Sequence, residues 1–196
     1  MIKVGFIGAG DIAYLHGEGV QASYNAQLHG IWNRTLAKAE EKASLFDTRV
    51  FDSAKELIEA VDVVYVLTNM ETHHAYCMQA IEAGKHVLVE KPTAVTIEEI
   101  EEIKTFAHLK GVQVAPVHNY IYEAPVMRAK ELIESGKLGD LVSLHVLYNI
   151  HHPEEVAARY PGVIRQILTH HAYCTLYLVC LLYTSPSPRD QRGSGV

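Results

Sequence analysis

The stretch Gly8-Ala9-Gly10-Asp11-Ile12-Ala13 decides the fold of this chain. It follows a short run of apolar and β-branched residues at positions 2–7 and opens a helical pattern over residues 11–22. A glycine-rich turn between a strand and a helix is the setting that the dinucleotide-binding fingerprint requires. Glycine triplets alone are weak signals, and an ordinary tight turn is the alternative.

The residues of this turn have distinct expected roles. Gly8 permits the sharp turn, Gly10 lets a pyrophosphate approach the backbone, and Ala13 lets the helix pack against the strand. The phosphates would then lie at the positive end of the helix. We therefore predict that all six residues, Gly8, Ala9, Gly10, Asp11, Ile12 and Ala13, bind the cofactor.

Short apolar runs alternate with helical patterns as far as residue 118. Ser53 and Glu56, like Thr96 and Glu99, form capping-box patterns that begin helices. This alternation predicts an α/β fold, a Rossmann-type doubly wound parallel sheet over residues 1–118. The expected strands are 2–7, 27–32, 61–67, 86–90 and 112–117, and the expected helices are 11–22, 35–45, one from Ser53, 71–83 and 96–111.

The pattern changes after residue 118. Residues 125–135 predict a helix closed by Gly136, residues 141–149 a long strand, and residues 172–179 an apolar helix. We interpret residues 119–179 as the truncated start of a second, α+β domain that would bind substrate and mediate oligomerisation.

The end of the chain has an unusual composition. The run Cys180-Leu181-Leu182-Tyr183-Thr184-Ser185-Pro186-Ser187-Pro188-Arg189-Asp190 is, residue by residue, a translation of a widely used transposase sequencing adapter. A natural Ser-Pro-rich linker is the alternative. Such scars are excluded from fold reasoning, so we expect residues 180–196 to be a non-native, disordered tail and the chain to be part of a longer protein.

Composition excludes several function classes. The chain has 196 residues, 48% of them hydrophobic, and a net charge of −6, which disfavours binding to nucleic acid. Its longest apolar run is too short to span a membrane. Three cysteines without metal-ligand spacing, and no evident signal peptide, favour the cytoplasm. Three His-His pairs occur, but neighbouring residues point in different directions, so we expect no metal.

The end of the second expected strand bears on the choice of cofactor. A carboxylate there usually accepts hydrogen bonds from the ribose 2′-hydroxyl of NAD, whereas an arginine accommodates the 2′-phosphate of NADP. The chain has Asn33 and Arg34 at this place and no acid. The pattern favours NADP over NAD, with a solvated loop arginine as the alternative.

Glu90-Lys91-Pro92 ends another expected strand. Ligands of open α/β sheets bind outside the carboxyl ends of the strands. Lys91 is therefore predicted to lie where a nicotinamide and a substrate meet, and an ordinary surface lysine is the alternative.

Taken together, these motifs resemble the Gfo/Idh/MocA oxidoreductases, a family named after glucose–fructose oxidoreductase, inositol dehydrogenase and rhizopine catabolism. The resemblance covers residues 1–179. It rests on the glycine turn, the turn Thr68-Asn69-Met70-Glu71-Thr72-His73, the Glu-Ala-Gly-Lys-His run into Glu90-Lys91-Pro92, and the stretch from Ala129 to Gly139. Asn69 stands where the family usually has proline.

The resemblance implies roles for individual residues. The family's active-site lysine, which assists proton transfer at the hydroxyl being oxidised, maps onto Lys91. Cofactor contacts are expected from Thr68, Asn69, His73, Glu90 and Lys91, in addition to Asn33 and Arg34.

A second family motif pairs an aspartate with a histidine four residues later. In this chain Gln166 replaces the aspartate, and the histidine is His170, with His171 as the alternative. An amide can orient a hydroxyl but cannot take its proton, so the proton work is expected to fall on His170 and Lys91. Asn119, Gln166 and His171 are expected to bind substrate.

The implied function is NAD(P)-dependent hydride transfer to or from a hydroxyl-bearing carbon of a sugar, cyclitol or similar small molecule. Because Gln166 replaces an acid, a non-catalytic sensor of dinucleotide or sugar is the runner-up. A third possibility is a redox-neutral enzyme that processes glycosides with bound cofactor. The resemblance also implies a homo-oligomer, and the fragment itself is expected to be inactive.

Overall fold

The computed structural model describes residues 1–147 and 167–179. The chain divides into two compact units, Met1–Val117 and His118–Val196. The predicted tail, residues 180–196, lies outside the described residues, as does Gln166.

The first unit is built on a parallel five-stranded sheet in the order β2-β1-β3-β4-β5. Each strand falls within or close to a predicted one, so the sequence pattern is confirmed as a Rossmann-type α/β fold. The strands are β1 (Ile2–Ile7), β2 (Ala26–Trp32), β3 (Val63–Val66), β4 (His86–Val89) and β5 (Val114–Pro116).

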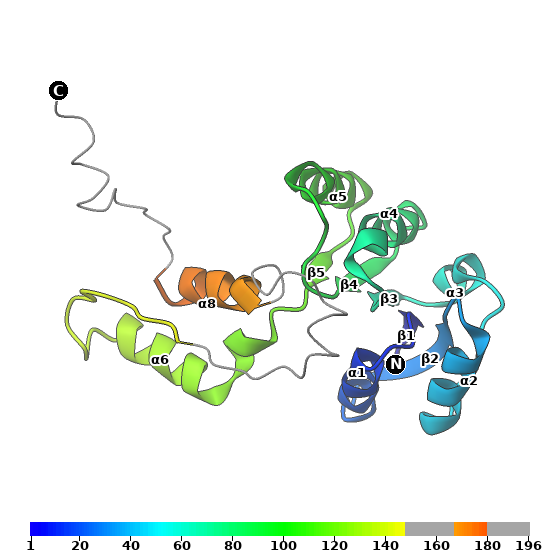
Figure 1. Cartoon of the computed structure of the whole chain (residues 1–196), viewed down its shortest axis with the longest axis horizontal. Helices are drawn as coiled ribbons and strands as arrows, with labels where there is room; N and C mark the ends of the chain where they lie inside the picture. Colours follow the sequence, from blue (N-terminus) through cyan, green and yellow to red (C-terminus); the bar gives the residue numbers. More distant parts are fainter. Residues whose placement is uncertain (148–166, 180–196) are drawn as a thin grey trace, which may run out of the picture. The chain divides into compact units, whose positions relative to one another are not determined.

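Helices cover both faces of this sheet, and a separate hydrophobic core fills the space on each side. Side chains of α1 and α2 pack on one face, and those of α3, α4 and α5 pack on the other. Figure 1 shows α4 and α5 together on the side of the strands away from α1. The helices are α1 (Ile12–Gln21), α2 (Leu36–Leu45), α3 (Ala54–Ala60), α4 (His73–Glu82) and α5 (Ile97–Lys110), and a 3₁₀ turn η1 (Met70–Thr72) precedes α4.

Capping residues predicted from the sequence begin two of these helices, although at α3 only the Ser53 half of the predicted capping box forms. The Ser53 hydroxyl accepts a hydrogen bond from the Glu56 amide at 3.2 Å, which caps α3. Thr96 and Glu99 form a complete capping box at the start of α5. That helix ends at Gly111, whose φ of 67° lies in the left-handed region that glycine tolerates best.

A sixth strand position is present as a single bridge. Val50 pairs in parallel with Ile31 on the outer side of β2. The Ile31 amide donates to the Arg49 carbonyl, and the Phe51 amide donates to the Ile31 carbonyl, both at 2.9 Å. Counted as a strand, this segment completes the order 3-2-1-4-5-6 of the dinucleotide-binding fold.

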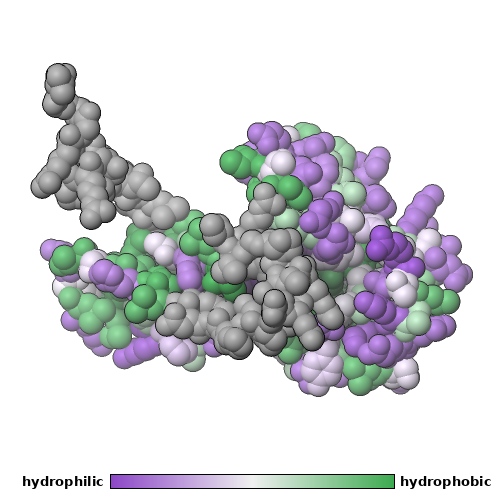
Figure 2. Space-filling model, viewed as in Figure 1, coloured by the Kyte–Doolittle hydropathy of each residue, from purple (hydrophilic) through white to green (hydrophobic). Residues whose placement is uncertain are grey.

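The second unit contains η2 (Asn119–Tyr122), α6 (Ala124–Glu134) and α8 (Thr169–Val179). The predicted strand over residues 141–149 is wrong for its described part, since residues 141–147 pair with no strand. A strand requires a partner for its backbone groups, and the described residues supply none here. Val142 and Leu147 are 94% and 89% exposed. Figure 2 shows hydrophobic surface on the α6 side of this unit.

Candidate cofactor and catalytic site

The glycine turn joins β1 to α1 and touches the end of β3. Gly8 has a φ of 113°, and a Cβ at this position would come within 2.7 Å of the Leu67 backbone carbonyl. Both the conformation and the close approach exclude a side chain. Gly8 therefore fixes the path of the backbone at the point where β1 lies between β2 and β3, which is the topological switch point of the sheet.

Gly10 is different, because packing within the chain does not require it. A Cβ at Gly10 would meet no atom within 4 Å. The described residues supply no hydrogen-bond acceptor to the amides of Gly10, Asp11 and Ile12 at the start of α1. Small size and free amides at a helix start suit a phosphate. Ala13, which is fully buried, packs the helix on the sheet as predicted. These features fit a dinucleotide.

Asn33 ties the loop after β2 to the glycine turn. Its side-chain oxygen accepts a hydrogen bond from the Ala9 amide at 3.2 Å, and its side-chain nitrogen donates to the Thr35 carbonyl at 2.9 Å. Asn33 is thus engaged in holding the turn itself. Arg34, the next residue of this loop, is exposed.

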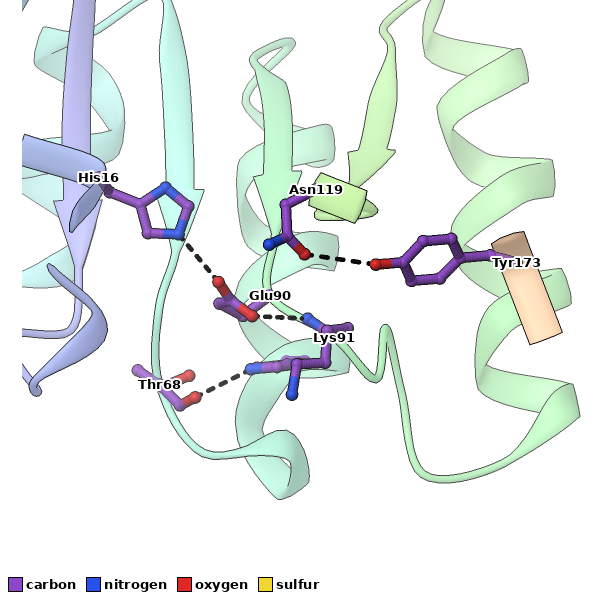
Figure 3. Close-up of polar contacts among 7 residues, drawn as sticks. His16, Thr68, Glu90, Lys91, Asn119 and Tyr173 are labelled. Carbon is purple, nitrogen blue, oxygen red and sulfur yellow. Dashed lines mark hydrogen bonds and ion pairs between the residues drawn. The ribbon is translucent and has the colours of Figure 1, made fainter. Parts of the chain in front are cut away.

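Glu90, at the end of β4, is buried and holds two neighbouring elements. Its carboxylate accepts a hydrogen bond from His16 Nε2 on α1 at 2.9 Å and another from the Lys91 amide at 3.0 Å. Figure 3 shows His16 pointing at this carboxylate, beside Lys91. Burial raises the pKa of Glu90, but the hydrogen bond and charge of His16, with the Lys91 amide, bring the net pKa below its ordinary value.

His73, which is expected to contact the cofactor, is buried and lies between two backbone carbonyls. The residue is 1% exposed. Its Nδ1 donates to the Pro92 carbonyl at 2.8 Å, and its Nε2 faces the Thr68 carbonyl at 3.0 Å. The ring is therefore buried and contacts two loops, the one after β3 at Thr68 and the one after β4 at Pro92.

The other residues of the turn after β3 are more accessible. The Thr68 hydroxyl accepts a hydrogen bond from the Thr72 hydroxyl at 2.8 Å. Asn69 is exposed, and its side-chain nitrogen Nδ2 donates to Glu71 Oε2 at 2.6 Å. Thr68 and Asn69 follow β3, at the same edge of the sheet as the glycine turn and Lys91, because all the strands are parallel.

In the second unit, Tyr173 connects two of the predicted residues. Its hydroxyl lies 2.5 Å from His170 Nδ1 and donates to Asn119 Oδ1 at 3.3 Å. Figure 3 shows the contact between Asn119 and Tyr173. Tyr173 also stacks on His118 with ring centroids 4.2 Å apart. The sequence reasoning missed Tyr173, although its spacing of three from His170 places both residues on one face of a helix.

The predicted histidines of α8 differ in exposure. His170 is 7% exposed, whereas His171 is half-buried. Burial lowers the pKa of the nearby His118 below its ordinary value. No three metal-ligating side chains gather anywhere in residues 1–147 or 167–179.

A glycine turn at the switch point of a parallel sheet is the defining feature of a class of dinucleotide-binding proteins. A family model described as an oxidoreductase family with an NAD-binding Rossmann fold matches residues 2–118, and the chain belongs to this family, the Gfo/Idh/MocA oxidoreductases.

Named relatives support this assignment. The chain is 34% identical over 146 residues to glucose-6-phosphate 3-dehydrogenase of Bacillus subtilis, covering 74% of this chain and 42% of the relative. It is 35% identical over 162 residues to scyllo-inositol 2-dehydrogenase (NADP(+)) of the same organism, covering 81% and 44%. The chain thus spans less than half the length of these curated relatives.

Solved structures share the fold. An NAD-binding protein from Listeria innocua superposes with a TM-score of 0.76 at 24% identity, covering 91% of this chain and 55% of that one. Apo scyllo-inositol dehydrogenase from Lactobacillus casei gives a TM-score of 0.67 at 23% identity, covering 71% and 43%. At these identities the likeness concerns the fold alone.

Proposed function

We propose that the full-length protein to which this chain belongs transfers a hydride between a nicotinamide cofactor and a hydroxyl-bearing carbon of a sugar or cyclitol. The observation that carries this proposal is the position of Lys91. It follows β4 at the edge of the sheet where the glycine turn lies, and the contact between Glu90 and His16 joins its turn to α1.

The chemistry divides between cofactor and protein. When bound, a nicotinamide cofactor would supply the hydride acceptor for oxidation of the carbinol carbon, or the hydride donor in the reverse direction. The substrate hydroxyl loses its proton in the same oxidation, and Lys91 Nζ is the group that we propose holds this proton. General acid–base assistance of this kind contributes about 10²- to 10⁴-fold to a rate.

His170 is the second proton-handling group in this proposal. Its Nδ1 is engaged by the Tyr173 hydroxyl at 2.5 Å. The bond that one ring nitrogen makes decides which nitrogen carries the proton. Nε2 is then the atom that exchanges a proton with the substrate, while Asn119, Gln166 and His171 orient its hydroxyl groups.

We propose NADP as the preferred cofactor. The exposed Arg34 follows Asn33, whose side chain is anchored to the glycine turn, so its guanidinium is available to a 2′-phosphate. One relative is named for its use of NADP. The carboxylate that would favour NAD is absent from residues 32–35.

Relatives named for glucose 6-phosphate and scyllo-inositol suggest a small polyhydroxylated substrate. We further propose a cytoplasmic homo-oligomer. The described cysteines, Cys77 and Cys174, are free thiols, and burial raises the pKa of Cys77 to about 12. Such an inert thiol suits a reducing compartment. None of the described helices is long and apolar enough to cross a membrane.

The test is a turnover assay on the full-length protein. NADP⁺ and NAD⁺ would be supplied with a panel of sugars, sugar phosphates and cyclitols, and reduced nicotinamide would be followed by its absorbance. We expect reduction with at least one member of the panel, faster with NADP⁺.

The replacement of an acid by Gln166 favours a second candidate, a sensor that binds dinucleotide or sugar without converting it. Tight binding of cofactor and sugar in calorimetry, with no reduction across the panel, would favour this second candidate.

A further inference from the structure

The turn Glu90-Lys91-Pro92 is fastened from both faces of the sheet. On one face, His16 of α1 donates to Glu90 Oε1 at 2.9 Å. On the other, His73 of α4 donates to the Pro92 carbonyl at 2.8 Å. The two helices belong to different hydrophobic cores, so the residues on either side of Lys91 are held independently.

Both histidines are themselves fixed. The His16 ring meets Phe6 and Tyr65 edge-on, with centroids 6.4 Å and 5.6 Å away, and its side chain is 13% exposed. The His73 ring lies between two backbone carbonyls and is almost fully buried. Rings confined in this way lose little further freedom when they make their hydrogen bonds.

His16 and His73 connect the turn that carries Lys91 to the elements expected to bind the cofactor. His16 belongs to the helix that the glycine turn opens. His73 Nε2 faces the carbonyl of Thr68, which follows β3 beside the same turn. A carbonyl only accepts, so the bond between His73 and Pro92 forms with the hydrogen on Nδ1.

We propose that His16 and His73 are positioning residues for Lys91, which tie its backbone to the elements that bind the dinucleotide. This inference rests on the proposed role of Lys91. The distance between a proton-handling group and the reacting carbon controls rate steeply, so that a displacement of about 1 Å can cost 10²-fold. The hydrogen bonds from His16 to Glu90 and from His73 to Pro92 hold the Lys91 backbone at the position where the nicotinamide is expected to bind.

The test uses the full-length protein and the variants His16→Ala and His73→Ala. We expect each to lower kcat about 10- to 100-fold, with the Kd for cofactor changed less than threefold. His16→Gln and His73→Gln, which keep one donor, should recover part of the rate. His74→Ala is the matched control, since His74 is adjacent to His73 but donates to Glu102 on α5.

A second measurement separates positioning from general loss of structure. In a Lys91→Met background, His16→Ala and His73→Ala should lower kcat no further, because both histidines act through the position of the lysine. Further loss in that background, or a kcat equal to that of His74→Ala, would overturn the inference. If Lys91→Met itself leaves turnover unchanged, the proposed function fails as well, so the two failures are distinguishable.

Discussion

The turn that carries Lys91 and the cluster around Tyr173 are held in different ways. In the first unit, the Lys91 and Glu90 amides and the Pro92 carbonyl take part in the hydrogen bonds, and the sheet supplies a partner from β3. In the second unit, the hydroxyl of Tyr173 contacts the side chains of His170 and Asn119 and the backbone of Tyr120. The turn that carries Lys91 is thus held largely through backbone groups, whereas the hydrogen bonds around Tyr173 share one hydroxyl.

The surroundings of the two regions differ as well. The Lys91 turn adjoins two buried cores. The second unit buries Tyr173 and His170, but α6 has no buried residue. In the first region several separate hydrogen bonds hold the backbone around Lys91, whereas in the second region the Tyr173 hydroxyl has three partners, so removing it breaks three contacts at once.

The largest expected effect comes from the anchored turn. Lys91→Met should lower kcat of the full-length protein about 10²- to 10⁴-fold, because it removes a proton-handling group. Cofactor affinity should change far less, since the phosphate contacts remain. Lys85→Met is the control, because Lys85 precedes the same strand at its opposite end. Unchanged turnover in a stopped-flow assay would contradict the role of Lys91.

Two glycines two positions apart should respond oppositely to alanine. Gly8→Ala should destabilise the first unit by about 2 kcal/mol or more, since both its φ and its contact with Leu67 exclude a side chain. Gly10→Ala should leave the free energy of unfolding nearly unchanged but weaken dinucleotide binding, because its Cβ has space only in the absence of phosphate. Urea unfolding and cofactor titration measure the two effects. Equal destabilisation by both variants would show that Gly10 is structural.

Removing the shared hydroxyl tests the second region. Tyr173→Phe should lower kcat about 10-fold and move the His170-dependent limb of the pH–rate profile, because the contact between Nδ1 and the Tyr173 hydroxyl is removed. Tyr177→Phe, one turn later on α8, should change neither quantity. A pH profile that is identical in the wild-type protein and Tyr173→Phe would separate Tyr173 from proton transfer.

A smaller effect is expected in the loop after β2, which Asn33 ties to the glycine turn. Arg34→Ala should weaken NADPH binding about 10-fold, equivalent to about 1.4 kcal/mol, and leave NADH binding nearly unchanged. Lys55→Ala is the control, because Lys55 is an exposed cation on α3. Fluorescence titration of both cofactors makes the measurement, and equal NADPH affinity in Arg34→Ala would remove the NADP assignment.

The smallest effect concerns acid stability, and it distinguishes the two regions by pH. Folding lowers the pKa of Glu90, so the ionised carboxylate stabilises the folded state. This contribution to the free energy of unfolding is fully present above the unfolded-state pKa of about 4.3 and is lost as the pH falls through the folded-state pKa. Burial lowers the pKa of His118, so the folded state favours the neutral ring. The free energy of unfolding therefore begins to fall at a higher pH in this region, as the pH drops below about 6.5, the ordinary pKa of histidine.

Hydrogen-exchange protection factors measured between pH 7 and pH 4 should therefore fall first around His118 and later around β4. His118→Phe should remove the first loss while retaining the ring that stacks on Tyr173. Simultaneous loss in both regions would contradict this order.

The sequence by itself determined the elements whose causes are local. The glycine turn, the capping box at Thr96 and the alternation of apolar runs predicted the parallel sheet and placed Lys91 at a strand end, because turn sterics, capping and periodicity each act within a few residues. Only the tertiary structure decided what surrounds that lysine. His16 and Glu90 are 74 positions apart, and Tyr173 and Asn119 are 54 apart, so no local pattern relates them. The sequence placed His73 in the correct turn but did not predict its burial, because burial depends on the helices packed around it. Over its described residues, 141–147, the predicted strand is absent for the same reason, since a strand forms only when the fold brings a partner to its backbone groups.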